Sequence, residues 1–198
     1  MSAVLTNARR EWGLIATNPL SDVRKPPKAP PRDRRVHTDE IEKLLESAGP
    51  DLCKLPARAV QSFLFAIETA MRAGEIVGLV WDRVDVKKRV ATLEMTKNGT
   101  SRQVPLSSRA VEILEGMPTG GESCFGISSA QLDVHFRKVR DKAKIKNLKF
   151  HDSRHEAITR LSKKLGILAL ARMVGHRDIE MLQIYYNETA EKIAQMLD

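Results

Sequence analysis

The sequence predicts one mainly helical α+β domain with a small antiparallel sheet. Apolar residues recur at a spacing of three to four over most of the chain, which is typical of amphipathic helices. Strand-type residues are confined to 89–95 and 103–106, and the turn-forming stretch KNGT at 97–100 between them indicates a hairpin. With 198 residues and 42% apolar content, the chain is long enough to bury one full core.

The first helix is expected over residues 4–16, where Asn18-Pro19 ends the apolar pattern. It is too short to stand alone. Residues 21–35, SDVRKPPKAPPRDRR, are rich in proline and positive charge and nearly free of large apolar groups, which favours an extended linker. The chain therefore divides into the end of another domain at 1–18, a basic proline-rich linker at 19–36, and the main domain at 37–198.

Two helices are expected to follow the linker. Thr38 caps the first, whose early turn holds acidic residues, and Gly49-Pro50 closes it. The second runs over 56–73 and puts Arg72 at the end of a buried helix, where its guanidinium needs a partner. Further helices are expected over 108–115 and 129–144, and from His151 onward as three or four short pieces interrupted at Gly166, Gly175 and Asn187.

Charge and cysteine content narrow the class of protein. Lys and Arg number 33 against 25 Asp and Glu, a formal charge of +8 that favours polyanionic partners such as nucleic acid, although a basic protein without such a partner fits equally well. The two cysteines are isolated, which argues against a disulfide framework or a zinc ribbon and fits a reducing cytoplasm. The sequence shows no secretory signal and no apolar run of about 20 residues, so we expect a soluble, intracellular protein without a membrane.

Several polar residues together fit phosphoryl transfer to and from a tyrosine, although each has an ordinary explanation alone. Guanidinium groups bind phosphate oxygens and stabilise the charge of the transition state, while lysine and histidine transfer protons. Lys97 alone could be a solvated hairpin residue, and His151 with His155 could suggest zinc, but no glutamate or cysteine stands where such a site needs one. The candidates are Arg72, Lys97, His151, Arg154, His176 and Tyr185.

The order and spacing of these residues resemble the catalytic domain of the tyrosine recombinases, the phage integrase family. ETAMRAGEIVGL at 68–79 is similar to the family's first arginine box, and HDSRH at 151–155 to its His-x-x-Arg box. MVGH at 173–176 resembles the turn with the later histidine, and Tyr185 follows nine residues after it. The hairpin TKNGTSRQVPL resembles the turn that carries the family's lysine.

The resemblance implies a role for each candidate residue. Arg72 and Arg154 would clamp the scissile phosphate, and Lys97 would protonate the leaving 5′ oxygen. His151 would assist proton transfer from the nucleophile, and His176 would hydrogen-bond a phosphate oxygen. Tyr185, favoured over Tyr186 by its spacing, would form a 3′-phosphotyrosine without metal, cofactor or ATP. Glu75 and Asp152 would support the reacting groups.

The resemblance also implies an architecture and partners. The sheet would have three strands, and residues 1–18 would end a core-binding domain, so that the natural protein is longer. The partner would be double-stranded DNA with attachment or core sites, bound by a homotetramer whose subunits are monomers in isolation, with an accessory DNA-bending protein. The protein would act in the cytoplasm of a bacterial host and would be encoded by a phage or prophage. A helix at Thr189–Leu197 would pack on its own domain or on a neighbouring subunit.

Departures from the family pattern bear on packing rather than on reacting groups. Ala70 stands where glycine is common, Ser153 where leucine is common, and Met181-Leu182 where two threonines often occur. Three alternatives remain open: a DNA-binding module of this fold without activity, a type IB topoisomerase-like relaxing enzyme, and, as the weakest, a metal-dependent nuclease.

Overall fold

The computed structural model describes residues 2–21, 23–24, 32–94, 101–175, 179–183, 185–186, 191 and 194–195. The chain folds into two compact units, Met1–Arg32 and Asp33–Asp198. Among the described helices, none combines the length and the apolar character that crossing a bilayer requires.

In the first unit the described residues include one helix, α1, over Ser2–Arg10. The sequence prediction carried this helix to residue 16 and was six residues too long. The chain instead turns through Gly13, whose φ of 60° lies in the left-handed region, and the backbone N–H of Leu14 donates to Ala8 at 2.9 Å. The apolar spacing beyond Arg10 therefore belongs to a turn and not to a longer helix.

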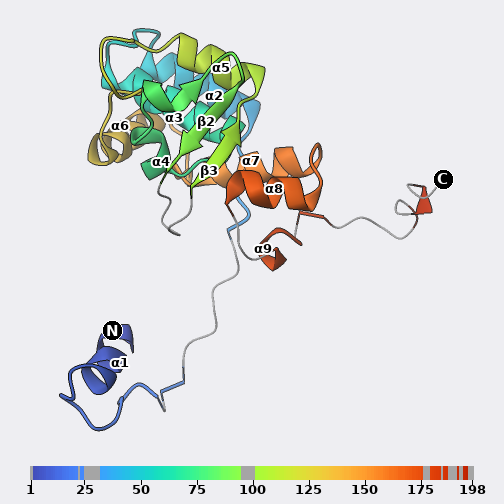
Figure 1. The fold of residues 1–198 in the computed structure, drawn as a ribbon. Coiled ribbons are helices and arrows are strands. Elements are labelled where there is room, and N and C mark those ends of the chain that lie inside the picture. Colours follow the sequence, from blue (N-terminus) through green and yellow to red (C-terminus); the bar gives the residue numbers. More distant parts are fainter. Residues whose placement is uncertain are drawn as a thin grey trace. The chain divides into compact units, whose positions relative to one another are not determined.

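The second unit is built around α3, Leu55–Thr69, whose residues are mostly buried. Helices α2 (Thr38–Ala48), α5 (Ser108–Glu115) and α6 (Ser129–Lys142) pack against it (Figure 1). Phe63 of α3 stacks on Phe136 of α6 with ring centroids 4.7 Å apart. This aromatic contact joins the two helices at the centre of the core.

A three-stranded antiparallel sheet covers one side of these helices, as the resemblance implied. Its strands β1 (Val84–Asp85), β2 (Val90–Leu93) and β3 (Arg102–Pro105) follow in chain order, and a 3₁₀ turn, η1, at Trp81–Arg83 leads into the first. Ala91 and Val104 pair in register and are both fully buried, so they fix the sheet's inner face. The predicted turn with Lys97 lies outside the described residues.

Helices α7 (Asp152–Ser162), α8 (Ile167–Val174) and α9 (Glu180–Gln183) follow, and α8 packs on β3 (Figure 1). Gly175 closes α8 with a φ of 67°, as the predicted interruption requires. Leu170 and Leu182 are buried in a second apolar cluster that also takes in Tyr185. Most of the helix expected at Thr189–Leu197 lies outside the described residues.

Other predicted helix boundaries also differ from the structure. Helix α3 stops at Thr69, because Ala70 turns left-handed with a φ of 54°, and a separate short helix, α4, covers Ala73–Val77. Arg72 therefore caps α4 and does not end a buried helix. Helix α2 is capped by His37 and not by Thr38, because the Glu40 carboxylate accepts a hydrogen bond from the His37 backbone at 3.1 Å.

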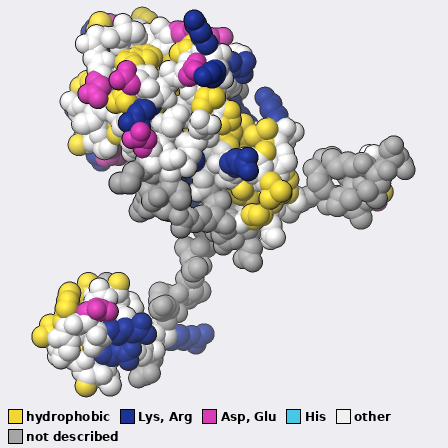
Figure 2. Space-filling model, in the orientation of Figure 1, with side chains coloured by type: hydrophobic (Ala, Val, Ile, Leu, Met, Phe, Trp, Pro, Cys, Tyr) yellow, Lys and Arg dark blue, Asp and Glu magenta, His cyan; other side chains and the backbone are white. Residues whose placement is uncertain are grey.

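Helix α8 exposes apolar side chains to solvent. In Figure 2, hydrophobic side chains gather where Figure 1 places α8, while basic and acidic side chains are interspersed over the rest of that face. Leu168 is 70% exposed, whereas Leu170 and Val174 are fully buried. The helix thus presents apolar side chains to the core and to solvent.

Candidate active site

Arg154 lies on the inward face of α7 and is almost fully buried. Its Nη2 donates to the carbonyl of Val174 at 2.8 Å, and its Nη1 donates to the carbonyl of Ala70. The left-handed turn at Ala70 presents this carbonyl, so one guanidinium ties α7 to the ends of α3 and α8. Burial, and then the charge of Arg72, lower the pKa of Arg154 to about 10, which leaves it charged at neutral pH.

Arg72 and Glu75 form a compact pair at the start of α4. The Arg72 Nη1 donates to Glu75 Oε1 at 3.0 Å, and the Arg72 backbone N–H donates to Glu75 Oε2 at 2.8 Å. The guanidinium keeps part of its surface open to solvent. A partly exposed guanidinium with one side fixed by a carboxylate can offer its other donors to a phosphate.

Arg102 of β3 is a supporting residue that the sequence reasoning missed. Its Nη1 and Nη2 donate to the two oxygens of Glu75 at 2.9 and 2.8 Å, and its Nε donates to the carbonyl of Met173 at 3.2 Å. The side chain is only 8% exposed. Burial alone would raise the pKa of Glu75, but the hydrogen bonds from Arg102 and from the Arg72 backbone outweigh it and lower that pKa.

His151 stands just before α7, beside the arginines. The residue is exposed to solvent, yet partial desolvation of the ring, and then the positive charges of Arg154 and Arg72, lower its pKa. Asp152, buried in the first turn of the same helix, accepts a hydrogen bond from the Lys149 backbone at 2.7 Å. Asp152 therefore braces the helix that carries Arg154.

Tyr185 follows α9, and its hydroxyl contacts a histidine other than His151. The Tyr185 Oη lies 2.7 Å from Nδ1 of His155, and the His155 Nε2 lies 3.1 Å from Asp33 Oδ1. Burial, and then the negative charge of Asp33, raise the pKa of Tyr185, while the charge of Arg154 acts in the opposite direction. The phenol is thus within electrostatic reach of one predicted phosphate-binding arginine.

The neighbouring Tyr186 is bound differently. Its hydroxyl donates to the carbonyl of Leu165 at 2.6 Å, in the turn between α7 and α8. This hydrogen bond anchors Tyr186 to its own fold, away from the contacts that Tyr185 makes. The Tyr186 hydroxyl is thus bound by a backbone carbonyl, whereas the Tyr185 hydroxyl contacts a histidine side chain.

A buried carboxylate on α7 anchors the segment with which the second unit begins. Glu156 is 3% exposed and accepts hydrogen bonds from Arg35 Nε and Arg160 Nε, both at 2.7 Å, and from the backbone of Val36 at 3.1 Å. His155 directly precedes Glu156 on α7. The hydrogen bonds of Arg35 and Val36 with Glu156 therefore keep Asp33 beside the His155 ring.

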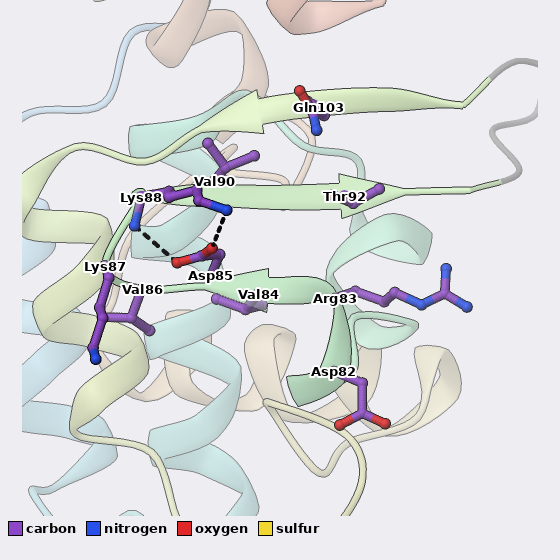
Figure 3. A pocket seen from close by; sticks show the side chains of 10 residues that line it. All are labelled: Asp82, Arg83, Val84, Asp85, Val86, Lys87, Lys88, Val90, Thr92 and Gln103. Atoms are coloured by element: carbon purple, nitrogen blue, oxygen red, sulfur yellow. Dashed lines mark hydrogen bonds and ion pairs between the residues drawn. The ribbon is translucent and has the colours of Figure 1, made fainter.

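Two hollows adjoin at the sheet. One, of about 740 Å³, is lined by residues from Asp82 to Lys88 and by β2, with Asp85 binding Lys88 across it (Figure 3). It contains none of the predicted site residues. The other, of about 710 Å³, includes Arg72 and Glu75 and shares Arg83 and Thr92 with the first. Of the described residues predicted for the site, Arg72 and Glu75 therefore line the second hollow.

The structure brings most of the predicted site residues to one place. The charges of Arg72 and Arg154 act on His151, and that of Arg154 acts on Tyr185. Lys97 and His176 lie outside the described residues. Sequence reasoning considered His155 only as a possible zinc ligand and missed its contact with Tyr185; its place directly after Arg154, on the same helix, was the available signal.

Replacing Arg102 with methionine is expected to lower the free energy of unfolding by about 2 kcal/mol, because a carboxylate that is only 11% exposed loses a charged hydrogen-bond partner. The matched control is Arg109→Met, since Arg109 also binds a glutamate, Glu112, at 2.8 Å but on the exposed surface. That variant should change stability by less than about 0.5 kcal/mol. Urea unfolding of both variants checks the difference, and equal losses would contradict a structural role for the Glu75 pair.

The comparisons with known proteins agree on one family. The model of the phage integrase family matches residues 34–192. A putative integrase/recombinase of Haemophilus influenzae is 44% identical over 96% of this chain and 65% of its own length. A shufflon-specific DNA recombinase of Escherichia coli is 37% identical over all of this chain and 51% of its own length. The chain thus spans about half to two thirds of these relatives.

A solved structure shows the same fold. A lambda integrase dimer bound to a COC′ core site superposes with a TM-score of 0.72 and 21% identity, over 96% of this chain and 71% of that one. The same integrase as a tetramer bound to a Holliday junction gives a TM-score of 0.70 over 93% of this chain and 56% of that one, again at 21% identity. These likenesses support the mainly helical architecture with its small sheet.

Proposed function

Because the chain belongs to the phage integrase family, the tyrosine recombinases, we propose that it is a site-specific DNA strand transferase that works through a phosphotyrosine. The observation that carries this proposal is the position of the half-buried Tyr185 hydroxyl beside α7, the helix that holds Arg154. The charges of Arg72 and of Glu75, which binds Arg72, also act on Arg154. A phenol within reach of one guanidinium, which itself lies close to a second, suits attack on a phosphodiester.

In the proposed reaction the Tyr185 oxygen attacks the scissile phosphorus. A bond forms from this oxygen to phosphorus, the bond to the 5′ oxygen breaks, and a 3′-phosphotyrosine results. A later attack by a 5′ hydroxyl reverses these steps and rejoins DNA. Each exchange replaces one phosphate ester with another, so neither ATP nor a metal is needed to balance it.

The arginines stabilise the charge that builds on the phosphate oxygens. A guanidinium carries five N–H donors, so Arg154 keeps donors for a phosphate even while it binds two backbone carbonyls. Lys97 is assigned the protonation of the leaving 5′ oxygen, and His176 a hydrogen bond to a phosphate oxygen. His151 is assigned a share in the proton transfers, although the hydroxyl of Tyr185 contacts His155 in the free protein.

The proposed partner is double-stranded DNA with attachment or core sites. We also propose that the protein acts as a homotetramer with an accessory DNA-bending protein, in the cytoplasm of a bacterial host of a phage or prophage. Residues 1–18 and 19–36 are assigned to the end of a core-binding domain and its linker. The lambda integrase bound to a Holliday junction as a tetramer supports this assembly by similarity of fold alone.

Covalent capture tests the proposal. The protein is incubated in EDTA with nicked DNA, or DNA bearing a 5′-bridging phosphorothiolate, that carries candidate core sites, and is then run on a denaturing gel. We expect a protein–DNA band. DNA cleavage that leaves no protein–DNA band and that EDTA abolishes would indicate a metal-dependent nuclease, and relaxation of plasmids of any sequence would indicate a topoisomerase. DNA binding without any band, also from a longer chain, would indicate an inactive DNA-binding module.

A further inference from the structure

We propose that His155 is the residue that receives the phenolic proton of Tyr185, with Asp33 as its positioning residue. The inference rests on the function proposed above and adds to it a proton acceptor that lies on α7, one residue after Arg154. It also gives a role in the reaction to Asp33, which comes from the segment ahead of the first helix of the unit.

The geometry is that of a nucleophile, a base and a group that orients the base. The Tyr185 Oη and the His155 Nδ1 are 2.7 Å apart, within direct proton-transfer distance. On the other side of the ring, the His155 Nε2 and Asp33 Oδ1 are 3.1 Å apart. Both ring nitrogens are engaged, one with the reacting hydroxyl and one with a carboxylate, as in hydrolases whose nucleophile is activated by a histidine.

Asp33 selects the tautomer of the ring. An ionised carboxylate only accepts hydrogen bonds, so the His155 Nε2 must carry the hydrogen that is donated to it. In a neutral imidazole the Nδ1 is then unprotonated and accepts the hydrogen bond from the Tyr185 hydroxyl. The proton therefore points from tyrosine to histidine before any substrate arrives.

The orienting carboxylate is held by its neighbours and not by burial. The Asp33 side chain is 90% exposed, whereas that of His155 is 19% exposed. Two residues further on, Arg35 binds the buried Glu156, and the Val36 backbone donates to the same carboxylate. These contacts seat the segment on α7 and leave Asp33 beside the ring.

The charges around the phenol explain why it needs an acceptor. Burial, and then the negative charge of Asp33, disfavour a free tyrosinate and raise the pKa of Tyr185. The charges of Arg154 and Arg35 favour the tyrosinate but do not prevent this rise. A neutral phenol at physiological pH is a weak nucleophile, so removal of its proton during attack lowers the barrier.

The step balances without a co-reactant. As the Tyr185 oxygen bonds to phosphorus, its proton moves to the His155 Nδ1, and the imidazolium that forms is stabilised by Asp33. The electron pair of the broken bond leaves on the 5′ oxygen, which takes a proton from the general acid. On rejoining, His155 returns its proton to the Tyr185 oxygen as that oxygen leaves phosphorus.

The variant His155→Gln tests the acceptor, because glutamine keeps a polar side chain but cannot take the proton. Covalent adduct formation is timed on ordinary nicked DNA and on DNA with a 5′-bridging phosphorothiolate, whose sulfur leaves without being protonated. We expect a loss of about 100-fold on both substrates. A general-acid variant, Lys97→Ala, should be slow only on ordinary DNA. The matched control is His135→Gln on α6, which should keep the rate of the parent.

Chemical rescue separates proton transfer from a structural role. Added imidazole should restore part of the rate of His155→Ala, which leaves space next to the Tyr185 hydroxyl, and should not change the rate of the parent. If His155→Gln forms the adduct at the rate of the parent, the inference is overturned while the proposed function stands. The same holds if His155→Ala forms the adduct slowly and added imidazole does not raise its rate. A parent that forms no adduct would overturn both.

Asp33 is tested with Asp33→Asn, and the exposed Asp39→Asn on α2 is its control. We expect a loss of about two- to fivefold, the range of an exposed charged contact. If Asp33 acts through His155, the loss should vanish in the His155→Gln background. The chain has two tyrosines, so a Tyr186→Phe background isolates Tyr185 in a spectroscopic titration. There Asp33→Asn should lower the pKa of Tyr185, and no change would overturn the role of Asp33.

Discussion

Tyr185→Phe is expected to abolish the covalent protein–DNA adduct, with a loss on the order of 1,000-fold or more, because the variant lacks the oxygen that would attack phosphorus. DNA binding should remain close to that of the parent, since binding rests mainly on contacts between basic residues and phosphates. The measurement is the denaturing-gel capture assay, with binding followed in parallel by a gel shift.

Tyr186→Phe is the matched control for this change. It removes the hydroxyl that donates to the Leu165 carbonyl at 2.6 Å, so it should lower the free energy of unfolding by about 1 kcal/mol. It should nevertheless form the adduct. An adduct that persists in Tyr185→Phe and disappears in Tyr186→Phe would transfer the role of nucleophile to Tyr186.

Glu156→Gln is expected to cause the largest loss of stability, about 3 kcal/mol at pH 7. Burial alone would raise the pKa of Glu156, but its hydrogen bonds with Arg35, Arg160 and Val36 outweigh this and lower the pKa from the usual 4.5 to about 2. The ionised form is therefore favoured in the folded protein, and glutamine mimics the protonated form. Urea unfolding measures the difference.

The loss should depend on pH in one direction. A carboxyl group whose pKa is lowered by folding stabilises the protein above its unfolded pKa, and this contribution disappears as the pH falls from about 4.5 through about 2. The difference between Glu156→Gln and the parent should accordingly shrink over that interval. Glu112→Gln, which alters an exposed pair, is the control. A difference that stays constant with pH would contradict the assigned pKa.

Regular elements were predictable where local patterns are strong. The helix at Ser108–Glu115 has the predicted bounds, because Ser107 caps it and Gly116 follows it. The break between α3 and α4 was missed, because the apolar spacing continues through Ala70 and nothing local to alanine signals a left-handed turn. At this turn the Ala70 carbonyl accepts a hydrogen bond from Arg154, which lies 84 residues further along the chain.

The site was predictable at the level of residue types and less so at the level of contacts. The resemblance to the family's motifs predicted Arg72, Arg154 and Tyr185 as site residues, and in the structure the charges of Arg72 and Tyr185 act on Arg154. The partners of these residues come from distant segments: Arg102 reaches Glu75 from a strand 27 residues away, and Asp33 reaches His155 across 122 residues. No local pattern encodes such pairs, so only the folded structure reveals them.

The binding of residues 33–36 to α7 decides where the second unit can be cut free. Judged by its prolines and basic residues, the linker would extend to Val36, and a fragment would begin at His37. Such a fragment lacks Arg35 and Val36, which supply three of the four hydrogen bonds that Glu156 accepts. A fragment that begins at Asp33 keeps them. The smallest piece that preserves this buried carboxylate in its native surroundings therefore starts inside the stretch that composition alone would discard.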